Sequence, residues 1–235
     1  METFFKDLTI PENITHVKLD IGLSYSAPQS QIWLSNEENL FVFGFEPNPD
    51  SVKCILNKDI VKRAPFHGTP ISNEYINSKF FLIPVALSNV IEPSKMDFYC
   101  MKNDTGTSSL FEPTDPNLGS IKEKIEVPVF SLKHFFDLFP WDRFDYIDYI
   151  KIDAQGADLD IIKSAGNYLK EKVVFITAEP ENAAYSGCKD NTCENMENYL
   201  NENNFLRINH PNTGDPTFIN KKFLHLQDKI YIKQI

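Results

Sequence analysis

Five short apolar runs, separated by segments of helical character, constrain the fold of this chain more than any other feature. The runs are too short to be typical helices, and their continuous apolar character is expected of strands covered on both faces of a parallel sheet. The alternation predicts a doubly wound α/β sheet with helices on both faces. The runs are VKLDI (17–21), LFVFGF (40–45), FFLIPVAL (80–87), YIDYIKI (146–152) and VVFITA (173–178). The helical segments are PQSQIWLSN, PDSVKCILN, SLKHFFDLF, ADLDIIKSAGNYL and NTCENMENYLNEN.

The C-terminal part of the chain departs from this alternation. FLRINH (205–210) and TFINKKF (217–223) flank the turn NTGDP, which predicts a terminal antiparallel hairpin on a mostly parallel sheet. We therefore expect a mixed sheet of about seven strands. MDFYCM and EKIEVPVF are further strand-like pieces that cover the cleft or form a small side hairpin. No linker or repeat divides the 235 residues, so we expect a single domain.

Composition and charge exclude several classes of function. The formal net charge is −10 and the pI is about 5.0, which disfavours nucleic-acid and anionic-membrane binding because lysine and arginine supply most of that affinity. No stretch approaches the ~20 apolar residues of a membrane span. The acidic N-terminal segment has no small-residue cleavage site, so we expect a cytoplasmic protein. Cys188 and Cys193 lack a second Cys/His pair at zinc-like spacing, so we expect ordinary thiols.

Acidic side chains follow the predicted strands at the edge where an open parallel sheet binds its ligands. The strand-end residues are Asp20, Glu46, Asp153, Glu179 and, after the sixth strand, His210. Acids after strands are also common as helix N-caps, so any one of them has an ordinary alternative explanation. Four acids at the ends of regularly alternating strands favour a pocket.

Glu46 carries the clearest functional signal. It follows the second predicted strand directly, 24 residues after Gly22, where a carboxylate can accept both hydroxyls of an adenosine ribose. Pro47 fixes the backbone after it. A nicotinamide dinucleotide would require a glycine-rich turn for its pyrophosphate, and no glycine follows Gly22 before Gly44. The residues therefore favour another adenosine cofactor over a nicotinamide-dependent oxidoreductase.

Two lysines interrupt apolar strands and require partners, because a buried unpaired cation is costly. Lys151 is flanked by Ile150 and Ile152 and should point to the opposite face from them, where Asp20 or Asp153 could pair with it. Lys18 has the same placement one strand over.

Several motifs in order resemble the FkbM family of S-adenosylmethionine-dependent methyltransferases. The motifs are KLDIG, FGFEPNP, PVALSN followed by MDFY, GTSSL, VPVFSLKHFF, IDYIKIDAQGADLDIIKSA and TAEPE. The resemblance covers residues 15–222, leaving a lead-in at 1–14 and a tail at 223–235. It implies a Rossmann-like class I methyltransferase fold. It also implies an O-methyltransferase that uses S-adenosylmethionine and acts on a hydroxyl of a sugar, glycan or similar small acceptor.

The resemblance assigns expected roles residue by residue. The cofactor-binding set that it implies is Asp20, Ile21, Gly22, Ser26, Glu46, Pro47, Val85, Ala86, Leu87 and Asp153. Candidates for the general base are Asp153, Glu179 and His210, whose imidazole titrates near neutrality. The expected substrate-binding residues are Thr107, Ser108, Gln155 and Tyr185. The family usually has glutamate where this chain has Gln155 and Asp158, so a role that needs a carboxylate at position 155 is in doubt.

The first loop and the partners leave alternatives open. Ser26 stands where the family places a later glycine, and Ser26-Ala27-Pro28-Gln29 fits a capping box at a helix start. Clustered carboxylates could also hold Mg²⁺, and the sequence does not decide metal dependence. The chain could be a non-catalytic glycan- or protein-binding module, or one piece of a larger glycosyltransferase-containing enzyme. Its oligomeric state is left open.

Overall fold

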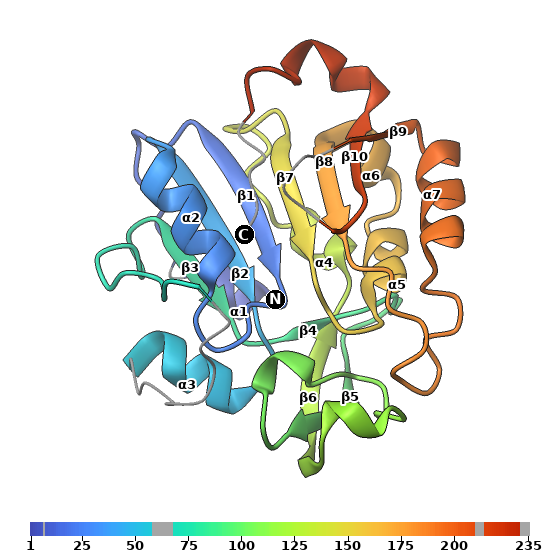
Figure 1. Cartoon of the computed structure of the whole chain (residues 1–235). Helices are drawn as coiled ribbons and strands as arrows, with labels where there is room; N and C mark the ends of the chain where they lie inside the picture. The colour runs from blue at the N-terminus through green and yellow to red at the C-terminus, as the bar shows by residue number, and fades with distance from the viewer. Residues whose placement is uncertain (7, 58–67, 210–213, 231–235) are drawn as a thin grey trace.

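A seven-stranded mixed sheet forms the centre of the molecule in the computed structural model, which describes residues 1–6, 8–57, 68–209 and 214–230 (Figure 1). The strand order is β3-β2-β1-β7-β8-β10-β9. The first five strands are parallel, and β10 runs antiparallel to both of its neighbours. This confirms the predicted mixed α/β sheet with a C-terminal antiparallel hairpin. The strands are β1 (His16–Ile21), β2 (Leu40–Phe45), β3 (Phe80–Ile83), β7 (Ile147–Ile152), β8 (Val173–Ala178), β9 (Phe205–Ile208) and β10 (Thr217–Asn220).

Helices cover both faces of this sheet because each strand buries side chains on both sides. One apolar core packs β1, β2 and β7 against α4 to α7 and also contacts α1. The second core packs the opposite face against α2, α3 and the C-terminal 3₁₀ segment η3. The helices are α1 (Glu2–Phe5), α2 (Pro28–Asn36), α3 (Pro49–Asn57), α4 (Leu132–Phe136), α5 (Asp158–Ser164), α6 (Asn167–Lys172) and α7 (Cys193–Glu202), with η3 at Lys221–Leu226.

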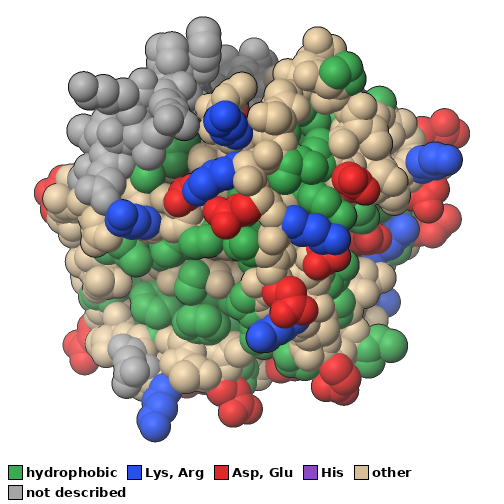
Figure 2. Space-filling view, turned by 90° about the horizontal axis from the view of Figure 1, so that it is seen from below, with side chains coloured by type: hydrophobic (Ala, Val, Ile, Leu, Met, Phe, Trp, Pro, Cys, Tyr) green, Lys and Arg blue, Asp and Glu red, His purple; other side chains and the backbone are tan. Residues whose placement is uncertain are grey.

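A smaller sheet lies at the carboxyl ends of the parallel strands (Figure 1). Its order is β4-β6-β5, and β5 and β6 form the antiparallel pair expected from MDFYCM and EKIEVPVF. Viewed from this end, hydrophobic side chains gather over the middle of the surface, with charged side chains of both signs around them (Figure 2). The strands are β4 (Ala86–Leu87), β5 (Ser94–Met101) and β6 (Ile121–Phe130), and the β5–β6 connection holds the 3₁₀ turns η1 (Thr105–Thr107) and η2 (Pro116–Leu118).

Two elements that the sequence predicts as continuous are divided in the structure. The run 80–87 splits into β3 of the large sheet and β4 of the small sheet, with Pro84 at the break, since proline offers no N–H to a central ladder. The helix predicted over 157–169 divides at Gly166, whose φ is +57°. Hairpin strands also end earlier than expected, and the residues after Asn220 enter η3.

The buried lysine Lys18 forms an ion pair on the α2 face of the sheet. Its Nζ lies 2.6 Å from Glu37 Oε1 and 5.1 Å from the centroid of the Trp33 ring. Burial lowers the pKa of Lys18, and the charge of Glu37 opposes that shift. The ion pair and the aromatic face together make a fully buried cation tolerable at this position.

The cysteines and the helices bear on the expectations for disulfides and membrane spans. The structure holds Cys54, Cys100, Cys188 and Cys193 as free thiols. Among the helices of the described residues, none combines the length and apolar character needed to cross a membrane.

Candidate active site

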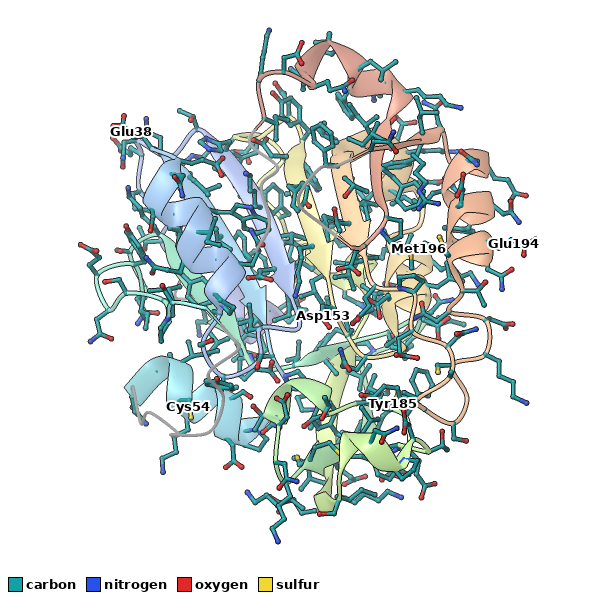
Figure 3. The ribbon with its side chains drawn as sticks, in the orientation of Figure 1. Glu38, Cys54, Asp153, Tyr185, Glu194 and Met196 are labelled. Atoms are coloured by element: carbon teal, nitrogen blue, oxygen red, sulfur yellow. The ribbon has the colours of Figure 1, made fainter. Side chains whose placement is uncertain are left out.

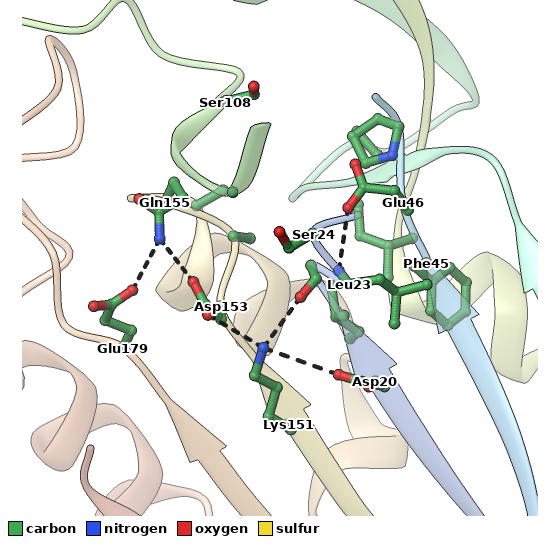
Figure 4. A pocket seen from close by; sticks show the side chains of 18 of the residues that line it. Asp20, Leu23, Ser24, Phe45, Glu46, Ser108, Lys151, Asp153, Gln155 and Glu179 are labelled. Atoms are coloured by element: carbon green, nitrogen blue, oxygen red, sulfur yellow. Dashed lines mark hydrogen bonds and ion pairs between the residues drawn. The ribbon is translucent and has the colours of Figure 1, made fainter. Parts of the chain in front are cut away.

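A cavity of about 340 Å³ lies beyond the carboxyl ends of β1, β2 and β7 (Figure 4). β1 and β7 are adjacent, and the chain leaves β1 toward β2 and β3 on one side but continues from β7 to β8 on the other. This reversal of strand order is the place where open α/β sheets bind their ligands. The volume lies within the ~300–1,000 Å³ typical of small-molecule sites.

Most of the residues predicted for the site line this one cavity. Those that line it are Asp20, Ile21, Gly22, Glu46, Pro47, Val85, Ala86, Leu87, Thr107, Ser108, Asp153, Gln155 and Glu179. Ser26 and Tyr185 do not line it, and both are buried. His210 falls outside the described residues. Val85, Ala86 and Leu87 reach the cavity from the small sheet and the break before it, not from the end of a third strand in the large sheet.

Gly22 lets the ends of β1 and β7 approach closely. Its φ is +80°, and a Cβ at this position would lie 1.8 Å from the backbone oxygen of Asp153. The Gly22 N–H donates to Phe45 O at 3.0 Å, and the Asp153 N–H donates to Ile21 O at 3.0 Å. A side chain at position 22 would therefore push these two strand ends apart.

Helix α2 begins one residue later than the predicted capping box requires. The residue before α2 is Ala27, with φ +48°, and no side chain caps the helix there. Asp20 caps it instead, because its Oδ2 accepts hydrogen bonds from Ser30 N at 3.0 Å and Ser30 Oγ at 2.6 Å. Ser24 is also left-handed, with φ +53°. The loop thus makes its turns with strained non-glycine residues, each costing on the order of 1–2 kcal/mol.

Lys151 lies between the ends of β1 and β7 and pairs with the strand-end acids there, as the sequence predicts (Figure 4). Its Nζ lies 3.2 Å from Asp153 Oδ2 and 3.9 Å from Asp20 Oδ1, and it donates to Gly22 O at 3.1 Å. Burial disfavours the charged amine, but the charges of Asp153 and Asp20 outweigh burial and raise its pKa. Lys151 therefore stays protonated and ties β1 to β7.

Glu46 joins the end of β2 to the loop after β1. Its Oε1 accepts from Asn48 N at 2.8 Å, and its Oε2 accepts from Leu23 N at 3.2 Å. Burial raises the pKa of Glu46 to about 8, although these backbone donors oppose the shift. Glu46 is 5% exposed and lines the cavity. A ligand that displaces water from its carboxyl group must therefore form hydrogen bonds with that group.

Asp153 and Glu179 flank the amide of Gln155 and differ in their affinity for protons. The Gln155 Nε2 donates to Asp153 Oδ1 at 2.7 Å and to Glu179 Oε2 at 3.0 Å. Burial favours protonation of Asp153, but Lys151 and Gln155 outweigh it and hold the pKa below its ordinary value. Burial and the charge of Asp153 raise the pKa of Glu179 to about 8. The site therefore places an ionised carboxylate beside a carboxyl group that titrates near neutrality.

The segment 104–110 covers the cavity from the small sheet. Ser108 Oγ accepts from Asn48 Nδ2 at 3.0 Å and from Met101 N at 3.0 Å, which links this segment to the Glu46 side. Ser109 Oγ donates to Gln155 O at 2.7 Å, which links it to the Asp153 side. Both ends of the cavity are thus connected through one covering segment.

Two acidic residues at or beside the cavity were not among the predicted site residues. Asp158 Oδ1 accepts from Ala154 N at 3.4 Å and from Glu179 N at 3.3 Å, and burial raises its pKa to about 7. Asp215 also lines the cavity, and the next residue, Pro216, accepts from Ala178 N at the end of β8. Asp158 lies in the motif IDYIKIDAQGADLDIIKSA, so its position near the site could be predicted from the sequence, but its contacts could not. Asp215 offered no signal, because only the tertiary fold brings the terminal hairpin to the cavity.

The comparison with known families identifies the architecture around this cavity. The model of the methyltransferase FkbM domain matches residues 27–207, which is most of the chain. The chain belongs to the FkbM methyltransferase family. The resemblance inferred from its motifs is confirmed, and its seven-stranded mixed sheet is the methyltransferase-like fold that the family implies. The Gly22 loop and β1 lie before the matched range, so their part in the site rests on the structure. No curated protein matches the chain.

The FkbM domain holds no recognisable metal cluster in its described parts. Within those ranges, no three histidine, cysteine, aspartate or glutamate side chains are grouped as metal ligands.

We predict that Gly22→Ala destabilises the protein far more than Gly166→Ala. Both glycines have positive φ, but a Cβ at Gly166 meets nothing within 4 Å. The control should lose about 1–2 kcal/mol of unfolding free energy from backbone strain alone. Gly22→Ala adds the clash with Asp153 and should lose roughly 2–5 kcal/mol. Chemical denaturation measures both, and equal losses would contradict the close approach.

We predict that the protein becomes less stable as pH rises from about 4 to 7, partly because of Asp158. Its pKa is raised from 3.8 to about 7 in the folded state, so the folded state binds more protons across this window. The stabilisation is complete below pH 3.8 and is lost as pH passes 7. Asp158→Asn keeps the acceptor oxygen and should flatten the dependence of the thermal midpoint on pH. A midpoint that falls equally steeply in this variant would contradict the assignment.

Proposed function

We propose that the chain is an S-adenosylmethionine-dependent O-methyltransferase that methylates a hydroxyl of a sugar, glycan or similar small acceptor. The observation that carries the proposal is the cavity of an FkbM-family chain, with Glu46 on one side and the Asp153–Glu179 pair on the other. An adenosine cofactor and an acceptor hydroxyl are the ligands that such a pair of subsites would suit. The family match favours this function over a nicotinamide-dependent one.

The lining of the cavity fits S-adenosylmethionine. Glu46 would accept the ribose hydroxyls. The hydroxyl oxygens of Ser24 and Thr105 line the cavity, are buried and have no hydrogen-bond partner among the described residues, so they are available to a polar ligand. An apolar wall would contact the adenine ring. This wall comprises Phe45, Val85, Ala86, Leu87, Phe98 and Leu110.

The charges of the site suit a cationic methyl donor. S-adenosylmethionine, when bound, supplies an electrophilic methyl group on a positively charged sulfur. Asp20 and Asp153 line the cavity with carboxylates that attract a cation, and Lys151 holds both in place. The segment 104–110 and Gln155 would align the acceptor and exclude water. Holding the reacting groups in line can alone supply several kcal/mol.

Glu179 is the residue best suited to take the proton of the acceptor hydroxyl. A general base works most efficiently when its pKa lies near the operating pH, and the pKa of Glu179 is about 8. Asp153 stays ionised and would stabilise positive charge rather than exchange the proton. In this assignment Glu179 would accept the hydroxyl proton as the acceptor oxygen bonds to the methyl carbon. The carbon–sulfur bond would break at the same time, with its electron pair left on the sulfur. His210 remains a candidate outside the described residues.

We expect Glu46→Ala to weaken binding of S-adenosylmethionine at least about tenfold, equivalent to ~1.4 kcal/mol. The reason is the loss of the acceptor for the ribose hydroxyls. Isothermal titration calorimetry measures the affinity, and Glu38→Ala is the matched control because Glu38 is exposed and lies far from Asp153 (Figure 3). An unchanged affinity in Glu46→Ala would contradict the assignment of Glu46 as the acceptor for the ribose hydroxyls. Binding of a nicotinamide nucleotide without S-adenosylmethionine would overturn the proposed function.

We expect the methylation rate to rise with pH through about 8, because Glu179 must lose its proton to act as a base. Glu179→Gln should lower kcat by ~10²–10⁴ and abolish this rise. The assay follows release of S-adenosylhomocysteine with a panel of oligosaccharides, and mass spectrometry of the glycan before and after incubation identifies the product. Cofactor binding without release of S-adenosylhomocysteine from any hydroxylated acceptor would favour a non-catalytic binding module.

A further inference from the structure

Gln155 sits in a strained turn that directs its side chain into the site. Gln155 and Gly156 are the central residues of the turn 154–157, with φ of +52° and +99°, and the Ala157 N–H donates to Ala154 O at 3.4 Å. Positive φ at both central residues is typical of turns rich in glycine, asparagine and aspartate. Glutamine is not favoured there, so its contacts must offset a conformational cost.

The amide of Gln155 has one usable orientation. Its nitrogen faces two carboxyl groups, to which it donates both of its protons. Its Oε1 accepts from the hydroxyl of Tyr185 at 2.8 Å. The reversed amide would set its oxygen against Asp153 and Glu179, leaving their oxygens without this donor. The two carboxyl groups therefore select this orientation, and the Tyr185 hydroxyl, whose single proton lies between Gln155 Oε1 and Thr107 O, supports it.

Tyr185 acts from behind the cavity wall. It is 3% exposed, packs in a small apolar cluster with Ala184 and Cys188, and does not line the cavity. Its hydroxyl also lies 2.8 Å from Thr107 O in the segment that covers the site. Burial and the charges of Glu181 and Glu179 raise the pKa of Tyr185, so it remains a protonated donor. The sequence predicts Tyr185 as a substrate-binding residue, and the structure places its side chain outside the cavity lining.

The groups around Glu179 make the Gln155 amide important. Burial raises the pKa of Glu179 most, and its hydrogen bond with Asp153 also raises it. The negative charges of Asp153 after β7, Asp158 on α5 and Asp215 before β10 raise it further. Glu181 and Asp104 add negative charge near Tyr185, and Lys151 is held by Asp153 and Asp20. Gln155 is the hydrogen-bond donor that the described residues bring to the Glu179 carboxyl group. Donation to a carboxylate favours its ionised form.

We propose that Tyr185 is a positioning residue that, through Gln155, keeps Glu179 able to ionise near neutral pH. This inference rests on the proposed function, in which ionised Glu179 takes the acceptor proton. Tyr185 fixes the amide, the amide donates to Glu179, and the same amide holds Asp153 beside it. Without the hydroxyl of Tyr185, the amide can rotate away and the three neighbouring acids disfavour ionisation unopposed.

The test measures the pKa of Glu179 directly, by carbon-13 NMR of its side-chain carboxyl group in the full chain. Tyr185→Phe should raise that pKa by about one pH unit, the scale of one hydrogen bond to a charged group. Tyr168→Phe is the matched control, because its hydroxyl donates to the surface residue Asp137. The control should leave the pKa of Glu179 unchanged.

Gln155→Asn provides a second variant in case Tyr185→Phe fails to fold. Asparagine suits a positive φ better than glutamine, but its amide is one carbon shorter and cannot span the same two carboxyl groups. We expect Gln155→Asn to raise the pKa of Glu179, as Tyr185→Phe does, without lowering the thermal midpoint of unfolding. If neither variant moves the pKa, the positioning role is wrong.

Kinetics separates this inference from the proposed function. With an accepted substrate, Tyr185→Phe should shift the rise of kcat with pH toward higher pH by the same one unit, with little change in KM. A raised KM with an unchanged pH profile would overturn the positioning role in favour of a purely structural one. If the wild-type chain neither binds S-adenosylmethionine nor methylates any acceptor, the proposed function fails, whereas the NMR result still decides whether Tyr185 controls Glu179.

Discussion

Lys151 holds together the two strand ends between which the candidate site lies. It reaches the carboxylates of Asp153 and Asp20 and the backbone oxygen of Gly22, so one buried cation joins β1, β7 and the first loop. Removing this cation would leave the buried carboxylate of Asp20 without compensation, which is more costly than the ion pair is stabilising. The charge of Lys151 also lowers the pKa of Asp153 and opposes the rise that burial causes in the pKa of Asp20.

The surroundings of the cavity give its acidic side chains very different pKa values. Asp153 is held below its ordinary value by Lys151, whereas Glu179 is raised to about 8 by burial and by the charge of Asp153. Two carboxyl groups with such different affinities for protons can divide electrostatic and acid–base work in one site. Gln155 makes this possible, because a neutral double donor between them avoids a third negative charge.

Much of the fold and part of the site follow from the sequence. Strands buried on both faces leave continuous apolar runs, so β1, β2, β7 and β8 were predictable almost to the residue. Strand-end acids were predictable because parallel strands end at one edge. The N-cap of α2 was predicted one residue too early, at Ser26, because matching residue types do not show that the Asp20 carboxylate accepts from the first turn of the helix. The contact of Tyr185 with Gln155 from outside the cavity lining was likewise not predictable.

The sequence by itself determined the family, the alternating elements and the acids at the strand ends, because periodicity and motif order are local properties of the chain. The tertiary structure alone decided which groups meet across that edge. Asp215 and Tyr185 reach the site from segments far along the chain, and the pKa values of Glu46 and Glu179 arise from burial that no single segment creates. Protonation depends on every charge and donor nearby in space, and those distances exist only once the chain has folded.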